Sequence, residues 1–304
     1  MIRRLNLKAY GKINLGLDVL RKREDGYHEV RMIMQTVGIY DKLELVYQEK
    51  PGITVETNLY YLPNNENNLV YKAAELLMKE FKTEGGVHIN LKKFIPVSAG
   101  MAGGSSDAAA VLTGLNKMLG LGLSREQLME RGVKIGADVP YCIMRGTALS
   151  EGIGEILTPL PPMPRCHVLI AKPGISVSTK FVYGNLRADS LRPEQHPDID
   201  GMAEAIRKKD LPGIARRFGN VLETVTIPAY PVIQEIKDIM AEYGALGALM
   251  SGSGPTVFGL FTDRKAAQNA YEELRYGKKS EAAKQVYLTD VYNVEDERGL
   301  WSTI

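Results

Sequence analysis

The stretch PVSAGMAGGSSDAAA, residues 96–110, decides the fold because its composition does not fit the needs of a hydrophobic core. It holds three glycines within five residues, at Gly100, Gly103 and Gly104, and an alanine-rich apolar run follows it as far as Leu115. Glycine lacks a Cβ atom, so this chain can reach positive φ angles and turn several backbone N–H groups toward one guest. The pattern predicts a loop that leads into a helix.

The first turn of this helix is expected to bind an anion. A helix N-terminus offers unpaired N–H donors and the positive end of the helix dipole, and both favour a phosphate group. Ser105, Ser106 and Asp107 stand at this point, and the two serines could bind phosphate or Mg²⁺ or could only cap the helix. The stretch contains neither a Walker A loop nor the G-x-G-x-x-G dinucleotide motif. The sequence therefore indicates a phosphate site of another kind.

Length and charge are those of an ordinary globular protein. A chain of 304 residues, 44% of them hydrophobic, predicts about two domains with a sizeable core. The formal net charge is +2 and no dense basic block occurs, so charge gives no reason to expect nucleic acid or a membrane as a partner. No obligate protein partner is evident from the sequence.

Cysteine usage and apolar runs favour a cytoplasmic location. Cys142 and Cys166 fit neither a CxxC motif nor a metal-ligand group, which indicates a reducing compartment and predicts no metal site built by the protein. No apolar run reaches the length of a membrane span, and residues 1–12 lack the core of a signal peptide. We therefore expect a cytoplasmic protein.

The apolar periodicity predicts a strand-rich first part followed by mixed elements. Strands separated by polar turns are expected at residues 2–8, 13–20, 30–37, 43–47, 53–56, 87–91 and 142–149. Helices are expected at residues 69–81, from the glycine-rich stretch to 119, and at 125–134. A proline-rich run at 159–164 predicts the boundary between an N-terminal domain, residues 1–158, and a C-terminal domain, residues 159–304.

Beyond this boundary the strands and helices predict a second α+β domain. Strands are expected at residues 166–171, 246–250, 256–261 and 283–291. Helices are expected after Val177, where they include Phe181 and Tyr183, and at residues 202–208, 211–218, 232–243 and 264–275. The polar segment 189–200 is expected to be an exposed loop.

Four segments, in this order along the chain, carry a resemblance to a known family. They are GKINL at residues 11–15, the glycine-rich stretch, GADVP at 136–140 and GSGP at 252–255. Each is weak alone, but together they span most of the chain, which resembles the GHMP kinase superfamily. The resemblance implies a two-domain α+β kinase, with an N-terminal ribosomal-S5-like domain and a C-terminal ferredoxin-like domain, that uses ATP and Mg²⁺.

Two further strings resemble one branch of this superfamily. DGYH at residues 25–28 and KPGISVST at 172–179 resemble the members that phosphorylate the 2-hydroxyl of 4-diphosphocytidyl-2-C-methyl-D-erythritol in non-mevalonate isopentenyl diphosphate biosynthesis. A homoserine- or mevalonate-type kinase would share the glycine-rich stretch but not these strings. An inactive nucleotide sensor on the same fold is the other alternative, and the presence of both Lys12 and Asp138 argues against it.

The resemblance implies that ATP binds to the glycine-rich loop, which we define as residues 96–106. Met101 and Ala102 stand here where the family usually has Leu-Gly, and alanine adds only a methyl group. The residues expected to bind ATP are Pro96, Val97, Ser98, Ala99, Gly100, Met101, Ala102, Gly103, Gly104, Ser105 and Ser106.

The resemblance also implies a catalytic pair, Asp138 and Lys12. Asp138 would accept the proton of the substrate hydroxyl, while Lys12 would keep that carboxylate ionised and stabilise the developing alkoxide. From the residues alone, Asp138 could instead bond to its own turn and Lys12 could lie at an exposed strand edge.

For the substrate, the resemblance implies two groups of residues. Tyr27, His28 and Tyr183 would hold the cytidine, although a surface histidine and a core tyrosine are the plain alternatives for the last two. Asn14 lies two residues from Lys12 and so on the same strand face, where it could hydrogen-bond the substrate. Thr179 is expected to help place the substrate.

Overall fold

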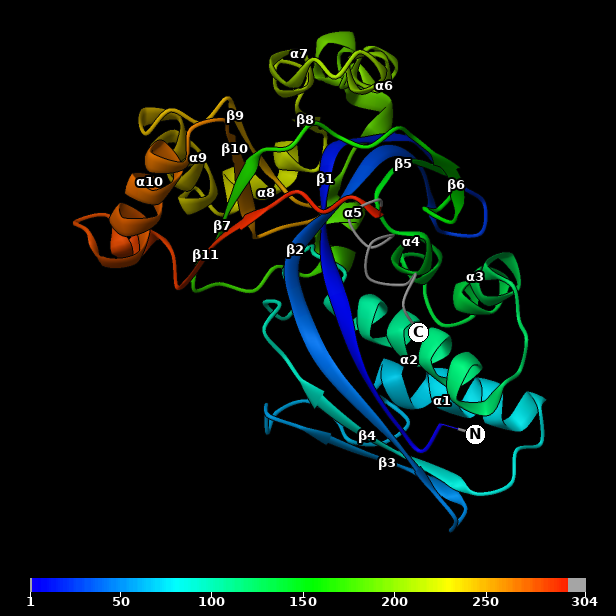
Figure 1. Ribbon diagram of the computed structural model, residues 1–304. Coiled ribbons are helices and arrows are strands. Elements are labelled where there is room, and N and C mark those ends of the chain that lie inside the picture. The colour runs from blue at the N-terminus through cyan, green and yellow to red at the C-terminus, as the bar shows by residue number, and fades with distance from the viewer. Residues whose placement is uncertain (1, 295–304) are drawn as a thin grey trace. The chain divides into compact units, whose positions relative to one another are not determined.

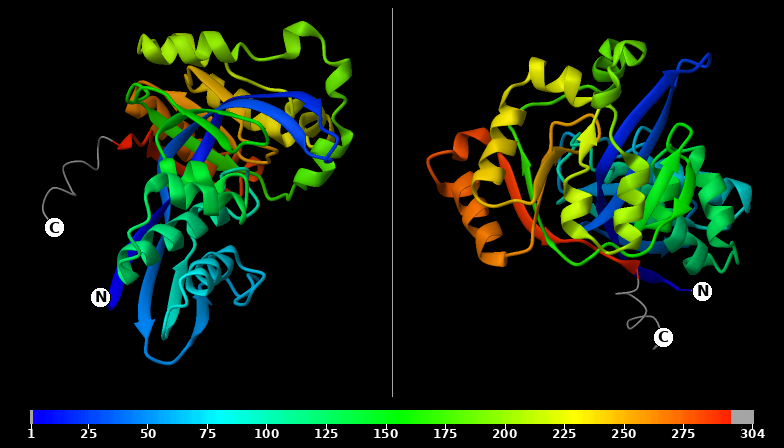
Figure 2. Two further views of the ribbon diagram at one scale, coloured as in Figure 1. Left: turned by 90° about the vertical axis from the view of Figure 1, so that its right-hand side faces the viewer. Right: turned by 90° about the horizontal axis from the view of Figure 1, so that it is seen from above.

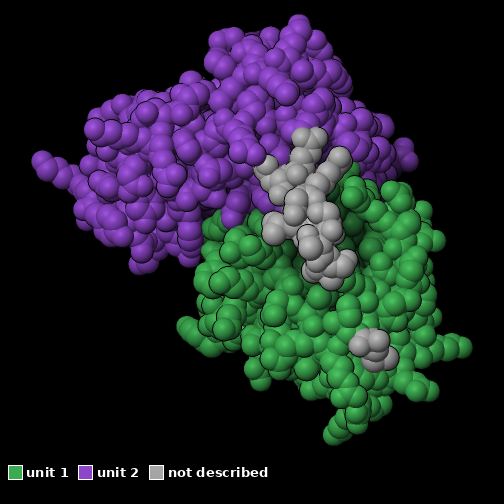
Figure 3. Space-filling model, viewed as in Figure 1, with its two compact units in different colours: residues 1–11, 39–97, 102–144 green, residues 12–38, 98–101, 145–304 purple. Residues whose placement is uncertain are grey.

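The computed structural model describes residues 2–294 (Figure 1). They form two compact units, each assembled from several segments (Figure 3): unit 1 comprises residues 2–11, 39–97 and 102–144, and unit 2 comprises residues 12–38, 98–101 and 145–294. The expected boundary between residues 158 and 159 falls inside unit 2, and this division into domains stays a prediction. Within residues 2–294, no helix combines the length and the apolar character that crossing a membrane requires.

Two long strands, β1 (Arg4–Lys22) and β2 (His28–Gln48), each contribute residues to both units. The sequence predicted two shorter strands and a polar turn in place of each, and that prediction is wrong. The polar residues at the expected turns are buried and paired: Lys12 donates to Asn14, and Asp41 is fully buried. Their partners let both strands continue through residues that look like turns.

Unit 1 contains part of a seven-stranded sheet, with helices packed on one face of that part (Figure 1). The strand order is β3-β4-β2-β1, in which β4 pairs antiparallel with β2 and parallel with β3. Its other elements are β3 (Gly52–Thr57), α1 (Leu69–Glu80), β4 (Gly86–Lys92), α2 (Gly103–Leu119), α3 (Arg125–Val133) and α4 (Val139–Met144). Alternate residues of the strands, among them Leu43, Leu45, Ile89 and Leu91, are buried and form the core with apolar residues of α1 and α2.

Caps fix two of these helices, which the sequence predicted at residues 69–81 and 125–134. The Asn68 side chain accepts from the backbone of α1, and Ser124 and Gln127 form the capping box of α3. The strand expected at residues 142–149 is wrong in its first half, where α4 runs to Met144. All six residues of α4 are buried, so they show no periodicity, and Pro140 is well suited to a first helical turn.

Unit 2 contains two groups of strands. In the first, β1 pairs in parallel with β8 (Gly219–Asn220), β2 pairs antiparallel with β5 (Thr147–Glu151), and β5 pairs with β6 (Ile156–Pro159). The second is an antiparallel sheet ordered β11-β7-β10-β9 with α9 and α10 packed against it (Figure 2). Its elements are β7 (His167–Lys172), α9 (Val232–Glu242), β9 (Gly247–Met250), β10 (Val257–Phe261), α10 (Arg264–Tyr276) and β11 (Gln285–Asp290).

The remaining elements of unit 2 are short. They are α5 (Thr179–Asn185), η1 (Ala188–Ser190), η2 (Pro193–Gln195), α6 (Ile199–Arg207), α7 (Leu211–Ala215), α8 (Glu223–Ala229) and η3 (Ser280–Ala282). The segment 189–200, expected as a loop, thus holds two short turns of 3₁₀-helix and the start of α6. The sequence also missed β6, β8 and α8, the last because Pro228 inside it resembles a helix breaker.

Candidate active site

The first turn of α2 leaves its backbone donors without side-chain caps. Ala102 is the N-cap residue, in the left-handed conformation with φ 53°, and it brings no side-chain hydrogen bond. The first helical bond runs from the N–H of Ser106 to the carbonyl of Ala102, at 2.8 Å. The N–H groups of the preceding residues are therefore available to an anion. The alternative that Ser105 and Ser106 serve only as caps is wrong, because the helix has already begun at Gly103.

The two serines of the loop have different surroundings within unit 1. The hydroxyl of Ser106 is buried and donates to the carbonyl of Tyr10, at 2.6 Å. The hydroxyl of Ser105 lies 3.9 Å from the place where a Cβ atom on Gly136 would stand. The segment that leads to Asp138 therefore passes beside the start of α2.

Asp138 stands at the N-terminus of α4. Its carbonyl accepts the first helical bond, from the N–H of Cys142, at 3.0 Å, and Val139 donates to Gly136, also at 3.0 Å. The predicted loop at 136–140 therefore ends at Asp138. Asp138 belongs to unit 1 and Lys12 to unit 2, so their pairing stays a prediction.

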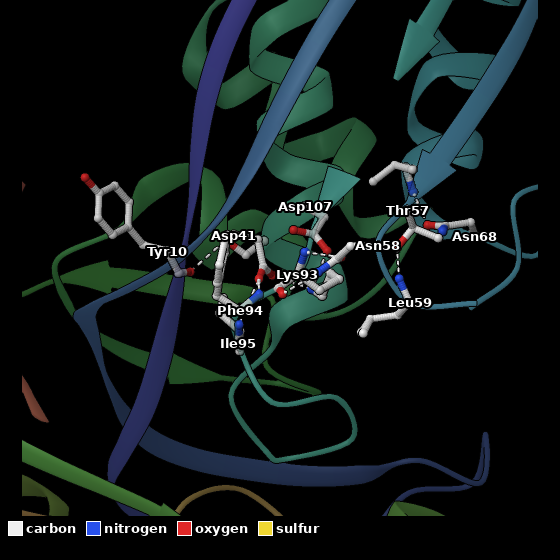
Figure 4. Close-up of polar contacts among 12 residues, drawn as sticks. Tyr10, Asp41, Thr57, Asn58, Leu59, Asn68, Lys93, Phe94, Ile95 and Asp107 are labelled. Carbon is white, nitrogen blue, oxygen red and sulfur yellow. Dashed lines mark hydrogen bonds and ion pairs between the residues drawn. The ribbon is translucent and has the colours of Figure 1, made fainter. Parts of the chain in front are cut away.

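A buried charge cluster, Asp41–Lys93–Asp107, lies beside Gly103 in unit 1 (Figure 4). The Lys93 ammonium donates to Asp41 and, at 2.6 Å, to Asp107. Burial raises the pKa of Asp107 well above its ordinary value, although Lys93 acts in the opposite direction. Burial alone would lower the pKa of Lys93, but the two carboxylates outweigh it and raise that pKa, so the ammonium stays charged. Neither Asp41 nor Lys93 was among the residues predicted to belong to the site.

Lys12 is a buried cation in unit 2, only 4% exposed. Its ammonium donates to the side-chain oxygen of Asn14 at 2.7 Å, and the Asn14 amide contacts the sulfur of Met32 at 3.1 Å. The Lys12 N–H also donates to the carbonyl of Met101 in the glycine-rich loop, at 3.1 Å. The alternative of an exposed strand-edge lysine is therefore wrong, and Lys12 and Asn14 are brought together as predicted.

Residues 98–101 of the loop pack against the turn at Ser251–Gly254, which also belongs to unit 2. Ser251 donates from its hydroxyl to the carbonyl of Gly100, at 2.9 Å. Asn220 fixes the turn by donating to the carbonyls of Met250 and Gly252, at 2.8 Å each. Asn220 was not predicted from the sequence, because its partners lie about 30 residues further along the chain.

Two of the three predicted cytidine residues are in contact. The rings of His28 and Tyr183 lie 5.0 Å apart, with 44° between their planes. Burial lowers the pKa of His28, and the charge of Lys22 adds to this, so the ring is neutral at pH 7 and offers one donor and one acceptor. Tyr27 is 60% exposed.

Thr179 begins α5 and contacts the turn at Ser251–Gly254. Its hydroxyl lies 2.8 Å from that of Ser253, and Ser178 caps the helix by accepting from the N–H of Phe181. Thr179 thus lies beside the turn that packs on the loop, whereas Tyr183 lies one helical turn further along the chain. Their roles toward a substrate stay predictions.

Comparisons with known proteins agree over nearly the whole chain. Residues 68–146 match the family described as GHMP kinases N terminal domain, and residues 202–279 match GHMP kinases C terminal. A 4-diphosphocytidyl-2-C-methyl-D-erythritol kinase of Lachnospira eligens is 57% identical over 288 residues, which cover 95% of this chain and 98% of that one. The chain belongs to the GHMP kinase family. This GHMP kinase is also 58% identical to the Lachnoclostridium phytofermentans protein of the same name, over 94% of this chain and 96% of that one.

A solved structure gives the same result for the fold. The crystal structure of a 4-(cytidine 5'-diphospho)-2C-methyl-D-erythritol kinase matches with a TM-score of 0.78 and 32% identity, covering 94% of this GHMP kinase and 99% of that chain. The predicted α+β GHMP kinase fold is confirmed. The prediction of an ATP-dependent small-molecule kinase is confirmed as well.

Proposed function

We propose that this GHMP kinase transfers the γ-phosphoryl group of ATP to the 2-hydroxyl of 4-diphosphocytidyl-2-C-methyl-D-erythritol. The observation that carries the proposal is identity above 55%, over nearly the whole chain, to two relatives named for a kinase of this compound. The DGYH and KPGISVST strings support the same substrate, because they are the segments that distinguished this branch at the outset.

The glycine-rich loop would bind the ATP phosphates through backbone donors. The uncapped first turn of α2 supports this, because its N–H groups and helix dipole suit an anion. Phosphoryl transfer depends chiefly on positioning and on charge stabilisation of the transferred group. The backbone donors would supply both without any side chain entering the reaction.

Mg²⁺ would enter this site with the ATP. Within residues 2–294, no three His, Cys, Asp or Glu side chains gather into a group that could hold a metal ion. Mg²⁺ is often held by substrate phosphates and water with only one or two protein ligands, so the site needs no such group. Of the two serines in the first turn of α2, Ser105 would be the one to bind the ion or a phosphate oxygen, because the Ser106 hydroxyl already donates to Tyr10.

Asp138 and Lys12 would serve the acceptor hydroxyl. The hydroxyl oxygen attacks the γ-phosphorus, its proton passes to the Asp138 carboxylate, and the bond to the β–γ bridging oxygen breaks to release ADP. Lys12 would stabilise the negative charge that develops on the attacking oxygen. Its burial and its bond to Asn14 support this role, because a desolvated and fixed ammonium interacts more strongly with a charge than an exposed one.

The His28–Tyr183 ring pair, with Tyr27, would hold the cytidine, and Asn14 and Thr179 would position the rest of the substrate. A neutral His28 supports this role. Its ring offers one hydrogen-bond donor and one acceptor, and cytosine carries both kinds of group along one edge. The predicted cytoplasmic location and the predicted lack of a nucleic-acid, membrane or obligate protein partner stay predictions.

A substrate panel tests the proposed function. MgATP turnover would be measured with 4-diphosphocytidyl-2-C-methyl-D-erythritol, homoserine and mevalonate in parallel. Turnover of the cytidine compound alone is the expected result. Turnover of homoserine or mevalonate instead would select the first alternative, and ATP binding without any turnover would select the inactive sensor.

Tyr183→Ala is expected to weaken substrate binding while sparing the chemistry. Stacking of a base on an aromatic side chain contributes about 1–3 kcal/mol, so KM for the cytidine substrate should rise by roughly 5-fold to 100-fold. Steady-state kinetics with each substrate varied should show kcat and KM for ATP nearly unchanged.

The matched control for this variant is Tyr276→Ala, which removes a 73% exposed tyrosine at the end of α10. Its kinetics should equal those of the wild-type enzyme. An unchanged KM for the cytidine substrate in Tyr183→Ala would return Tyr183 to the role of a packed tyrosine.

A further inference from the structure

The Asp41–Lys93–Asp107 cluster joins three segments of unit 1 at the glycine-rich loop (Figure 4). Asp41 lies in β2, Lys93 directly follows β4, and Asp107 lies in the second turn of α2. The side chains of all three are at most 5% exposed. One buried ammonium therefore ties the start of α2 to the strands.

The same cluster fixes the chain that enters the loop. The second carboxylate oxygen of Asp41 accepts from the N–H groups of Phe94 and Ile95, at 2.5 and 2.8 Å. The backbone of Lys93 is held as well, since its N–H donates to the Asn58 side chain at 2.8 Å and its carbonyl accepts from it at 3.2 Å. Within unit 1, the cluster anchors the loop both before Pro96 and after Ser106.

The ammonium also lies beside a residue whose N–H is expected to meet phosphate. A Cβ atom on Gly103 would stand 3.2 Å from Lys93 Nζ and 3.2 Å from the Ile95 side chain. Gly103 opens α2 and is one of the uncapped donors of its first turn. The Lys93 ammonium therefore lies next to the space that a side chain at residue 103 would occupy.

The cluster contains one more acidic group than a buried ion pair needs. Two carboxylates share one ammonium, and Oδ1 of Asp107 has no hydrogen-bond partner among the described residues. Buried polar atoms without partners are costly to a fold and rare in native structures, so this one calls for an explanation. An apolar core would have connected these strands and this helix at lower cost.

We propose that Lys93 is a positioning residue for the nucleotide. By bridging Asp41 and Asp107, it holds the first turn of α2 and the Phe94–Ile95 segment in place. The loop can then present its N–H groups to the ATP phosphates. This inference rests on the proposed function for the identity of the ligand. Lys93 acts through the loop and does not touch the substrate.

Lys93→Met tests the proposal, because methionine keeps the length of the side chain and removes the ammonium. The dissociation constant of the Mg²⁺ complex of adenosine 5'-(β,γ-imido)triphosphate, measured by calorimetry, should rise at least about tenfold. In turnover assays KM for ATP should rise equally, while KM for the cytidine substrate stays within about twofold and kcat falls less than about threefold. Lys92→Met, the same change at the exposed neighbouring residue of β4, should change none of these values.

Two further variants separate positioning from stability. Asp107→Asn still offers an oxygen to Lys93, so its nucleotide affinity should stay within about threefold of the wild type. Lys93→Met leaves two buried acidic groups without a counter-ion, whereas Lys93→Met/Asp107→Asn leaves only Asp41, which keeps two backbone donors, so the melting temperature should recover in part relative to Lys93→Met. The nucleotide affinity of the double variant should stay as low as that of Lys93→Met.

A folded double variant that binds the nucleotide analogue like the wild type would overturn the proposal. Failure of both Lys93→Met and the double variant to fold would overturn it too, since the cluster would then serve the fold alone. The binding measurement does not depend on turnover. A wild-type protein that binds the analogue but leaves the cytidine substrate unphosphorylated would contradict the proposed function and not the role of Lys93.

Discussion

Asp138→Asn is expected to lower kcat by roughly 100-fold or more, the scale of a lost acid–base group. Asparagine has nearly the same shape as aspartate and is as good a residue at a helix N-terminus, so α4 should still begin at Val139. The amide cannot accept the proton of the acceptor hydroxyl. Steady-state kinetics should therefore show the loss in kcat, with KM for ATP and for the cytidine substrate within about threefold of the wild type.

A matched control removes a carboxylate with no proposed role. Asp238 lies on the exposed side of α9. The variant Asp238→Asn should therefore leave kcat and the melting temperature unchanged. Circular dichroism would establish that Asp138→Asn is folded. If a folded Asp138→Asn protein kept near-normal kcat, Asp138 would only position the segment before α4 and the proton would leave by another route.

The parts of the fold that sequence alone predicted are those governed by neighbouring residues. Asn68 and Ser124 mark helix starts because a cap acts within three residues of itself. The loop that leads into α2 follows from its own glycines in the same way. The resemblance to GHMP kinases rests on four such local segments, and the family match confirms it.

The parts that sequence alone missed depend on partners far along the chain. Asp41 looks like a turn residue until Lys93 and the Phe94 N–H group are placed beside it, more than 50 residues later. The turn at Ser251 likewise contacts the glycine-rich loop through a hydrogen bond to Gly100, which lies 151 residues earlier in the chain. No periodicity or motif contains these pairs, because the fold alone brings them together.

The site was predicted best where a residue is both part of a motif and locally constrained. Lys12 and Asn14 alternate along one strand, so their common face follows from strand geometry alone. Tyr183 was selected through the resemblance, and its contact with His28 spans two elements that only the fold joins. Asn220 had no local motif to mark it.

Gly100→Ala is expected to raise the dissociation constant of the imido analogue of ATP on the order of 100-fold, or ~2.8 kcal/mol. A Cβ atom on Gly100 would overlap the carbonyl oxygen of Ser251. It would also lie only 2.9 Å from the carbonyl carbon of Ser251. Both groups are backbone, so no rotamer change can relieve the collision. The hydrogen bond from Ser251 to Gly100 should be lost, and residues 98–101 should move away from their bond to Lys12.

Gly120→Ala separates this collision from the cost of the backbone conformation itself. Gly100 and Gly120 have φ angles of 69° and 65°, but a Cβ atom on Gly120 would meet nothing within 4 Å. Thermal unfolding should show a loss of about 1 kcal/mol for Gly120→Ala through left-handed strain, and a larger loss for Gly100→Ala, where the collision adds to that strain. Only Gly100→Ala should lose nucleotide affinity, because only there must two packed segments separate. Equal nucleotide affinities in the two variants would show that the contact between the loop and the Ser251 turn does not set ATP binding.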